Sequence, residues 1–164
     1  ATAKPASAGR PSYRHTISTT PINEDASAAI NAAYNSIRSD GSSTTWMVLA
    51  GSKGQLFLES QGTDDVDAVQ HLDDAAVQWL YMRVAYTGAT TDYPNRAEEI
   101  PKFTKFVLVQ WTGPNASRMV RMQTLSLKGK VKEYVRHATL ELEVQDVADL
   151  RRDALVEQLR RCGR

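Results

Sequence analysis

The apolar run from Phe106 to Trp111 constrains the fold more than any other feature of this chain. A strand with one solvent-facing side alternates apolar and polar residues, whereas a nearly continuous apolar run is typical of a strand buried on both faces. Such a strand needs covering layers on each side of its sheet. A chain of 164 residues is long enough to supply them within one domain.

The rest of the chain divides into alternating helical and extended patterns. Asn23 is expected to cap the first helix, Asp146 is expected to cap the last, and a kink is expected near Gln123 to Ser126 in the third helix. Hairpins mixed with helical crossovers predict an α/β protein with a central mixed β-sheet flanked by helices on both faces. The expected elements are helix 23–38, strands 44–50 and 55–60, helix 64–74, strands 77–86 and 103–111, helix 115–136, strand 139–144 and helix 147–161.

Residues 1–21 differ in composition from the remainder. They are rich in Ala, Ser, Thr and Pro and contain Lys4, Arg10 and Arg14 but no acid. We expect a flexible basic tail at 1–21, inert rather than an accessory contact, followed by a single domain at 22–164. The single cysteine, Cys162, and the lack of a signal-like or membrane-spanning apolar segment favour a cytoplasmic protein.

The residues that usually carry catalysis or bind metals do not form a recognisable pattern. The three histidines, His15, His71 and His137, lack ligand spacing, and no dinucleotide, phosphate-loop or nucleophile-elbow motif occurs. The acidic pairs, Asp64-Asp65 and Asp73-Asp74, fit helix caps or solvent-facing positions better than catalytic carboxylates. We therefore expect no metal, no cofactor and no enzymatic activity.

Positive charge is concentrated between Lys102 and Arg136, where Glu133 is the only acid, although the whole chain carries a net charge of only +1. Within this stretch Lys128, Lys132 and Arg136 follow at four-residue intervals and should form a stripe on one helix face. Like charges in such a stripe repel one another, which predicts docking to an acidic macromolecule. A solvated helix face remains the alternative.

Several short segments form a pattern through their order and spacing: Ala32-Ala33-Tyr34-Asn35, Arg38, Asp40-Gly41-Ser42, Trp46, Lys105-Phe106, Trp111, Gly113, Asn115, Ser117, Arg121, Thr124, Val131-Lys132-Glu133 and Val135. Taken together they resemble the coactosin branch of the actin-depolymerising factor homology family over residues 23–161. The similarity implies that family's fold, a mixed sheet between helices.

The resemblance also implies non-enzymatic binding to the side of filamentous actin, without strong depolymerisation. In coactosins a lysine before the apolar run is important for filament binding, and Lys105 occupies that position here; the long helix is the other main contact element. The last helix belongs to the family's filament-specific surface, so its arginines are weaker candidates. The candidate actin-binding residues are Lys102, Lys105, Arg118, Arg121, Lys128, Lys130, Lys132, Arg151 and Arg152.

Two other functions remain open on the sequence: a cofilin-like factor that binds monomers and disassembles filaments, and a module that binds anionic phosphoinositide lipids. Nucleic-acid binding is not expected, because exposed aromatic residues among the cations are scarce and the net charge is near zero. We expect a monomer associated with the cytoskeleton. The loop from Thr87 to Pro101 is longer than in typical coactosins and adjoins Lys105, where it would either extend or obstruct the filament contact.

Overall fold

The computed structural model describes residues 19–89, 92, 94 and 100–162 of the chain. Expectations about residues 1–18 and about the central part of the loop after Thr87 lie outside the described residues. Among the described residues, no helix is both long enough and apolar enough to cross a membrane.

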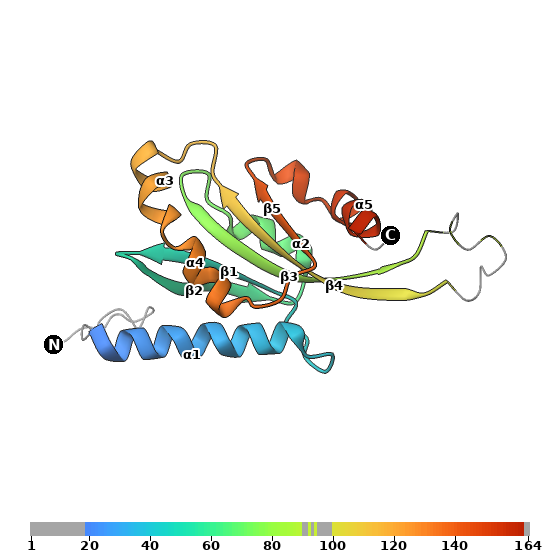
Figure 1. The fold of residues 1–164 in the computed structure, drawn as a ribbon, viewed down its shortest axis with the longest axis horizontal. Coiled ribbons are helices and arrows are strands. Elements are labelled where there is room, and N and C mark those ends of the chain that lie inside the picture. Colours follow the sequence, from blue (N-terminus) through green and yellow to red (C-terminus); the bar gives the residue numbers. More distant parts are fainter. Residues whose placement is uncertain (1–18, 90–91, 93, 95–99, 163–164) are drawn as a thin grey trace.

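The described chain contains one five-stranded sheet in the order β2-β1-β3-β4-β5 (Figure 1). Neighbouring strands are antiparallel except for β5, which runs parallel to β4, so the predicted mixed sheet is confirmed. A type I′ turn at Lys53-Gly54, with φ of 52° and 78°, joins the first two strands. The strands are β1 (Trp46–Ser52), β2 (Gln55–Gly62), β3 (Val77–Thr87), β4 (Lys102–Thr112) and β5 (Leu140–Val144).

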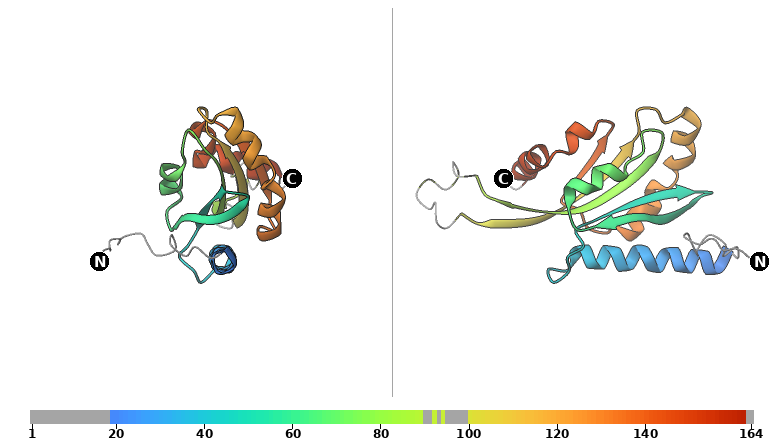
Figure 2. Two further views of the ribbon diagram at one scale, coloured as in Figure 1. Left: turned by 90° about the vertical axis from the view of Figure 1, so that its left-hand side faces the viewer. Right: turned by 180° about the vertical axis from the view of Figure 1, so that it is seen from behind.

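Helices cover both faces of the sheet, as predicted. One face packs against α1 (Thr19–Arg38), α3 (Arg118–Leu125) and α4 (Lys128–Tyr134). The other packs against α2 (Asp65–Ala68) and α5 (Arg152–Cys162), each extended by a short 3₁₀ turn. The view along the sheet shows α2 on one side and α3 and α4 on the other (Figure 2).

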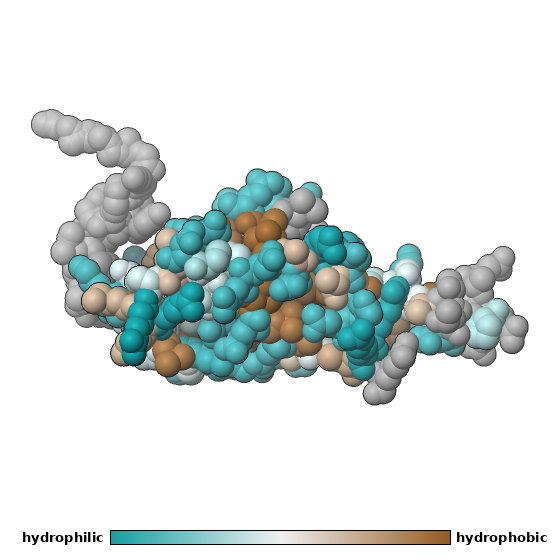
Figure 3. Space-filling view, turned by 90° about the horizontal axis from the view of Figure 1, so that it is seen from above, coloured by the Kyte–Doolittle hydropathy of each residue, from teal (hydrophilic) through white to brown (hydrophobic). Residues whose placement is uncertain are grey.

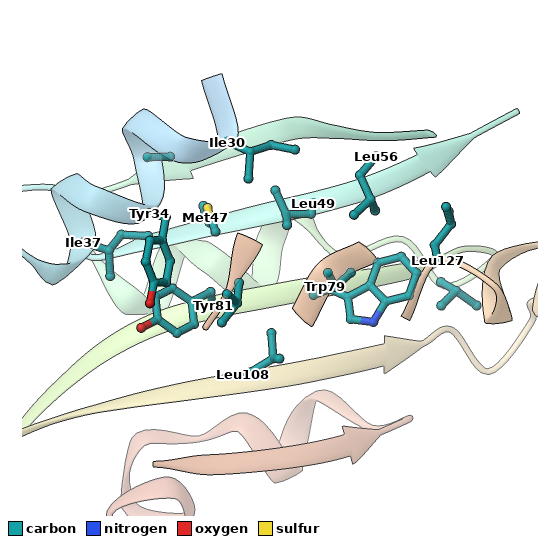
Figure 4. Packing of buried hydrophobic residues seen from close by; sticks show 14 residues of the cluster. Ile30, Tyr34, Ile37, Met47, Leu49, Leu56, Trp79, Tyr81, Leu108 and Leu127 are labelled. Atoms are coloured by element: carbon teal, nitrogen blue, oxygen red, sulfur yellow. The ribbon is translucent and has the colours of Figure 1, made fainter. Parts of the chain in front are cut away.

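The apolar run in β4 supplies both cores. Leu108 packs with Tyr81 beneath α1 and α4, whereas Val107 and Val109 pack beneath α5. Figure 4 shows the first core, in which side chains from α1, the central strands and Leu127 converge. Burial on both sides of β4 is therefore confirmed. The strand packs against the helices on both faces of the sheet.

Two predicted helix boundaries were wrong. The first helix begins at Thr19 rather than at Asn23, so Asn23 lies inside it and is not its cap. Pro21 is tolerated because the amides of a first helical turn have no partner within the helix. The second helix ends before Asp74, because Asp73 instead accepts a hydrogen bond from the Ala75 amide in a turn leading into β3.

The other two corrections are breaks within helices. The predicted kink in the third helix is a break at Ser126 and Leu127, which separates α3 from α4. Leu127 is 2% exposed and occupies the space beside Gly51, so burial of its side chain accompanies the change of direction. The last helix is likewise interrupted at Arg151, after a 3₁₀ turn (Val147–Leu150) in which the Asp146 side chain caps the Ala148 amide, as expected.

The ends of β3 and β4 project beyond the helices as a two-stranded arm (Figure 1). Pairing of β1 with β3 stops at Met82, and pairing of β5 with β4 begins only at Val107. Residues 83–87 and 102–106 therefore form ladder pairs only with each other, and we call them the hairpin arm.

Candidate functional site

The basic stretch of the sequence is divided in space into two groups. Lys102 and Lys105 lie in the hairpin arm, whereas α3 follows the opposite end of β4 (Figure 1). Thr112 lies seven residues after Lys105 along the strand, a span of about 24 Å. The structure therefore does not form the single basic face that the sequence suggested, but two charged surfaces at opposite ends of the sheet.

The arm surface carries the lysine highlighted by the family resemblance. Lys105 is partly buried, with Nζ 5.9 Å from the centre of the Phe103 ring, which in turn lies 5.5 Å from the ring of Tyr86. Lys102 is exposed near the tip of the described part of β4. The aromatic pair gives the arm a small apolar surface near the Lys105 ammonium group.

The start of the last helix lies beside this arm. Arg152 donates to the main-chain oxygen of Ala85, so its guanidinium is already engaged with the arm. Arg151 instead lies 3.7 Å from Asp153 at an exposed position. Arg152 thus braces the arm, whereas Arg151, the residue before α5, is a surface residue paired with Asp153.

The second surface begins at α3. The Ser117 side chain caps this helix by accepting a hydrogen bond of 3.1 Å from the Val120 amide. Arg121 Nε donates to the main-chain oxygen of Ala116 at 3.1 Å, which holds its guanidinium beside the first turn. Arg118 and Arg121 are both exposed, so the predicted cations of this helix face solvent.

Sequence reasoning missed an apolar stripe between these cations. Met119, Met122 and Leu125 are 67%, 66% and 64% exposed, the highest values among the large apolar residues of the described chain. Their spacing of three residues was the available signal, because it places them away from the face that buries Thr124. Exposed apolar residues gathered beside arginines are typical of a protein interface.

A groove of about 340 Å³ separates α3 from β5, with Met122, Leu125 and Arg121 on one side and Val144 on the other. Seen from above, apolar surface occupies the middle of the molecule and is bordered by hydrophilic residues (Figure 3). No three His, Cys, Asp or Glu residues within the described ranges are grouped so that they could hold a metal ion. Exposed apolar and basic side chains beside a groove are suited to docking of a macromolecule.

The lysines of α4 are not the unpaired stripe that the sequence suggested. Lys128 Nζ lies 3.6 Å from Glu143 Oε1, and Lys132 forms an ion pair with Glu141. Both acids lie in β5, outside the basic stretch, so the charges within that stretch gave no sign of the pairing. The helix ends at Tyr134, so the third predicted cation, Arg136, lies beyond it, with its guanidinium over the Tyr34 ring.

Lys130 points in another direction from its two neighbours. Its Nζ donates a hydrogen bond of 2.7 Å to the main-chain oxygen of Gly54, in the turn between β1 and β2. The contact joins α4 to the sheet. Its acceptor is a main-chain oxygen, so this bond does not neutralise the lysine charge as a carboxylate would. The structure thus places all nine predicted cations: Lys102 and Lys105 in the arm, Arg151 and Arg152 at the start of the last helix, and the other five in α3 and α4.

Comparison with known proteins identifies the family. Residues 23–160 match the family described as "Cofilin/tropomyosin-type actin-binding protein". The chain belongs to this family. The members of this family are actin-binding proteins, which are not a class of enzymes. Within the family the chain is similar to the coactosin branch, as the sequence resemblance indicated.

Coactosin relatives cover most of the chain. The rat coactosin-like protein is 29% identical over 135 residues, which cover 82% of this chain and 88% of the relative. A crystal structure of the human coactosin-like protein superposes with a TM-score of 0.70 at 27% identity, covering 82% of this chain and 95% of that one. A solution structure of mouse coactosin, described as an actin filament binding protein, gives a TM-score of 0.62 at 27% identity, covering 82% and 87%.

Proposed function

We propose that this protein binds the side of filamentous actin and modulates filament dynamics without strong depolymerisation. The observation that carries the proposal is the exposed stripe of Met119, Met122 and Leu125, flanked by Arg118 and Arg121 on a capped helix. Apolar anchors bordered by cations suit a partner whose surface combines hydrophobic pockets with acidic residues. The mouse relative, described as an actin filament binding protein, supports filaments as that partner.

The second part of the contact is the arm surface. Lys102 and Lys105 lie about 24 Å or more from α3 along β4, too far apart to line one compact pocket. Two separated surfaces on one sheet suit an extended macromolecular partner. The proposed contact residues are Lys102, Lys105, Arg118, Arg121, Lys128, Lys130, Lys132, Arg151 and Arg152.

In this proposal the protein acts in the cytoplasm as a monomer that associates with the cytoskeleton and catalyses no reaction. Since its contact residues are largely exposed cations, association with an acidic filament should be steered by charge and weakened by salt. The same cations would also attract anionic phosphoinositides, which are the second candidate ligand.

Cosedimentation with filamentous actin over a salt series, run beside a monomeric-actin binding assay, tests the proposal. We expect salt-sensitive pelleting with filaments and weak binding to monomers. Tight monomer binding would instead favour a cofilin-like disassembly factor. Binding to phosphoinositide vesicles that is unaffected by added actin would favour the lipid-binding alternative.

A further inference from the structure

We infer that Glu141 and Glu143 of β5 act as built-in competitors for Lys128 and Lys132 of α4, and so lower the affinity of the α3–α4 surface for an acidic partner. The inference rests on the proposed function and concerns how strongly that surface binds. It assigns a role to two acids that lie outside the basic stretch of the sequence.

The geometry of the two elements makes both pairs possible at once. Lys128 and Lys132 are four residues apart on a helix, a rise of about 6 Å. Glu141 and Glu143 are two residues apart on a strand and share one face, about 6.6 Å apart. These spacings match, so Lys128 meets Glu143 at 3.6 Å while Lys132 meets Glu141.

The pairs change the charge of the surface that the helix presents. Lys130 contributes a third positive charge, but Glu133 lies on the same helix. The three lysines of α4 are matched in number by three glutamates, one on the helix and two on the adjacent strand, so the formal charges of α4 and β5 together cancel. The lysine-rich helix therefore adds no net charge to the folded protein once its neighbouring strand is counted.

Both ion pairs are exposed enough for an acidic partner to replace the glutamates. The side chains of the two lysines are 50% and 42% exposed, and those of Glu143 and Glu141 are 69% and 51% exposed. A groove of about 230 Å³ lies against the four charged side chains, so they are not packed into the core. Exposed ion pairs contribute little to folding, and a partner's carboxylates can replace the glutamates without unfolding α4 or β5.

The test is the double variant Glu141→Gln with Glu143→Gln, compared with the wild-type protein in filament cosedimentation. Loss of the competing acids should tighten binding by roughly two- to fivefold for each pair at low salt. The gain should shrink toward 0.15 M salt, where exposed charges are screened beyond about 8 Å. Unchanged or weaker binding would overturn the inference.

A matched control removes two exposed acids elsewhere. The variant Asp40→Asn with Asp67→Asn changes the net charge equally, at the turn after α1 and on α2. It should not reproduce the gain. Adding Lys128→Gln and Lys132→Gln to the double Glu variant should abolish the gain, and a gain that persisted would overturn the inference by showing a general charge effect.

Chromatography on immobilised polyglutamate separates this inference from the proposed function. The double Glu variant should elute at higher salt than either the wild type or the Asp control. If the wild type fails to bind filaments but this shift occurs, the actin proposal fails and the competition for the lysines is supported. Elution together with the Asp control would overturn the competition whatever the actin result.

Discussion

Arg160 of α5 donates a hydrogen bond of 2.8 Å from Nη2 to the main-chain oxygen of Thr87 at the end of β3. Two residues earlier in β3, the oxygen of Ala85 accepts a hydrogen bond from Arg152. The main-chain polar groups of alternate residues in a strand point to the same edge of that strand. The Arg83 amide donates to the Thr45 oxygen just before β1, so the oxygens of Ala85 and Thr87 point to the same edge of β3, the one that β1 occupies earlier in the strand. The last helix therefore takes the place that β1 vacates beside the hairpin arm.

We predict that Arg160→Gln loosens the arm without unfolding the domain. Losing this bond should speed amide hydrogen exchange in residues 84–87 and 102–105, by roughly fivefold for a loss of about 1 kcal/mol. Arg151→Gln is the matched control, because Arg151 pairs with Asp153 rather than with the arm. Equal exchange rates in both variants and the wild type would contradict a bracing role for α5.

Lys105→Ala should weaken filament cosedimentation by roughly three- to tenfold while leaving the melting temperature nearly unchanged. The ammonium group lies 5.9 Å from the centre of the Phe103 ring, and a cation–π contact at a solvent-accessible site contributes about 0.5–1 kcal/mol to stability. Lys53→Asn offers a control with the same loss of charge, since asparagine tolerates the positive φ at that turn. Equal pelleting of the two variants would remove Lys105 from the contact.

The stripe on α3 gives a different kind of prediction, because it depends on apolar contact rather than on charge. Met119→Ser with Met122→Ser should reduce filament affinity by tenfold or more, about 1 kcal/mol for each side chain, and the loss should not diminish at high salt. Since both residues are about two-thirds exposed, thermal stability should change little. Val147→Ser, at another exposed apolar site, is the control, and matching losses would argue against the stripe.

The sequence was sufficient to predict the fold because its signals were local. The apolar run of β4 and the alternating pattern of β5 each required covering layers that the neighbouring helices provide. Helix ends were less predictable, since the break at Leu127 depends on the space beside Gly51, about 75 residues earlier. Contacts of that kind leave no mark in a local window of sequence.

The candidate site was predicted less well than the fold. The cations were recognisable as a group, but their division between two ends of the sheet follows from the length of β4 and from the turn into α3. The pairing of Lys128 and Lys132 with β5 was also hidden, because nothing in the local sequence places Glu141 and Glu143 beside α4. Sequence patterns give charge along the chain, whereas binding depends on charge in space.

Gly113 sets the entry into α3, and we predict that Gly113→Ala destabilises the protein. A Cβ at this position would lie 2.1 Å from the main-chain oxygen of Asp74, whose turn also accepts hydrogen bonds from Asn115 and Trp111. Backbone cannot move aside as a flexible side chain does, so a loss of about 2–3 kcal/mol is expected in urea unfolding. Gly129→Ala, where a Cβ meets no atom within 4 Å, should not destabilise α4.

Burial of the Tyr81 hydroxyl should make the free energy of unfolding depend on pH in the alkaline range. Its hydroxyl donates a hydrogen bond of 2.8 Å to the main-chain oxygen of His137, and burial raises its pKa well above 10.0, with Arg38 opposing the shift. The folded state therefore keeps a proton that the unfolded chain loses near pH 10. The stabilisation is fully present below that pH and falls as the pH rises above it.

The variant Tyr81→Phe isolates this contribution. At pH 7 it should lower the free energy of unfolding by about 1 kcal/mol, because the His137 carbonyl loses its donor. Between about pH 10 and 12 its stability should decline less steeply than that of the wild type. Tyr86, whose pKa is also raised by burial and lowered in part by Arg160, remains in both proteins and accounts for a shared residual slope. Parallel curves in urea titrations would contradict the assignment to Tyr81.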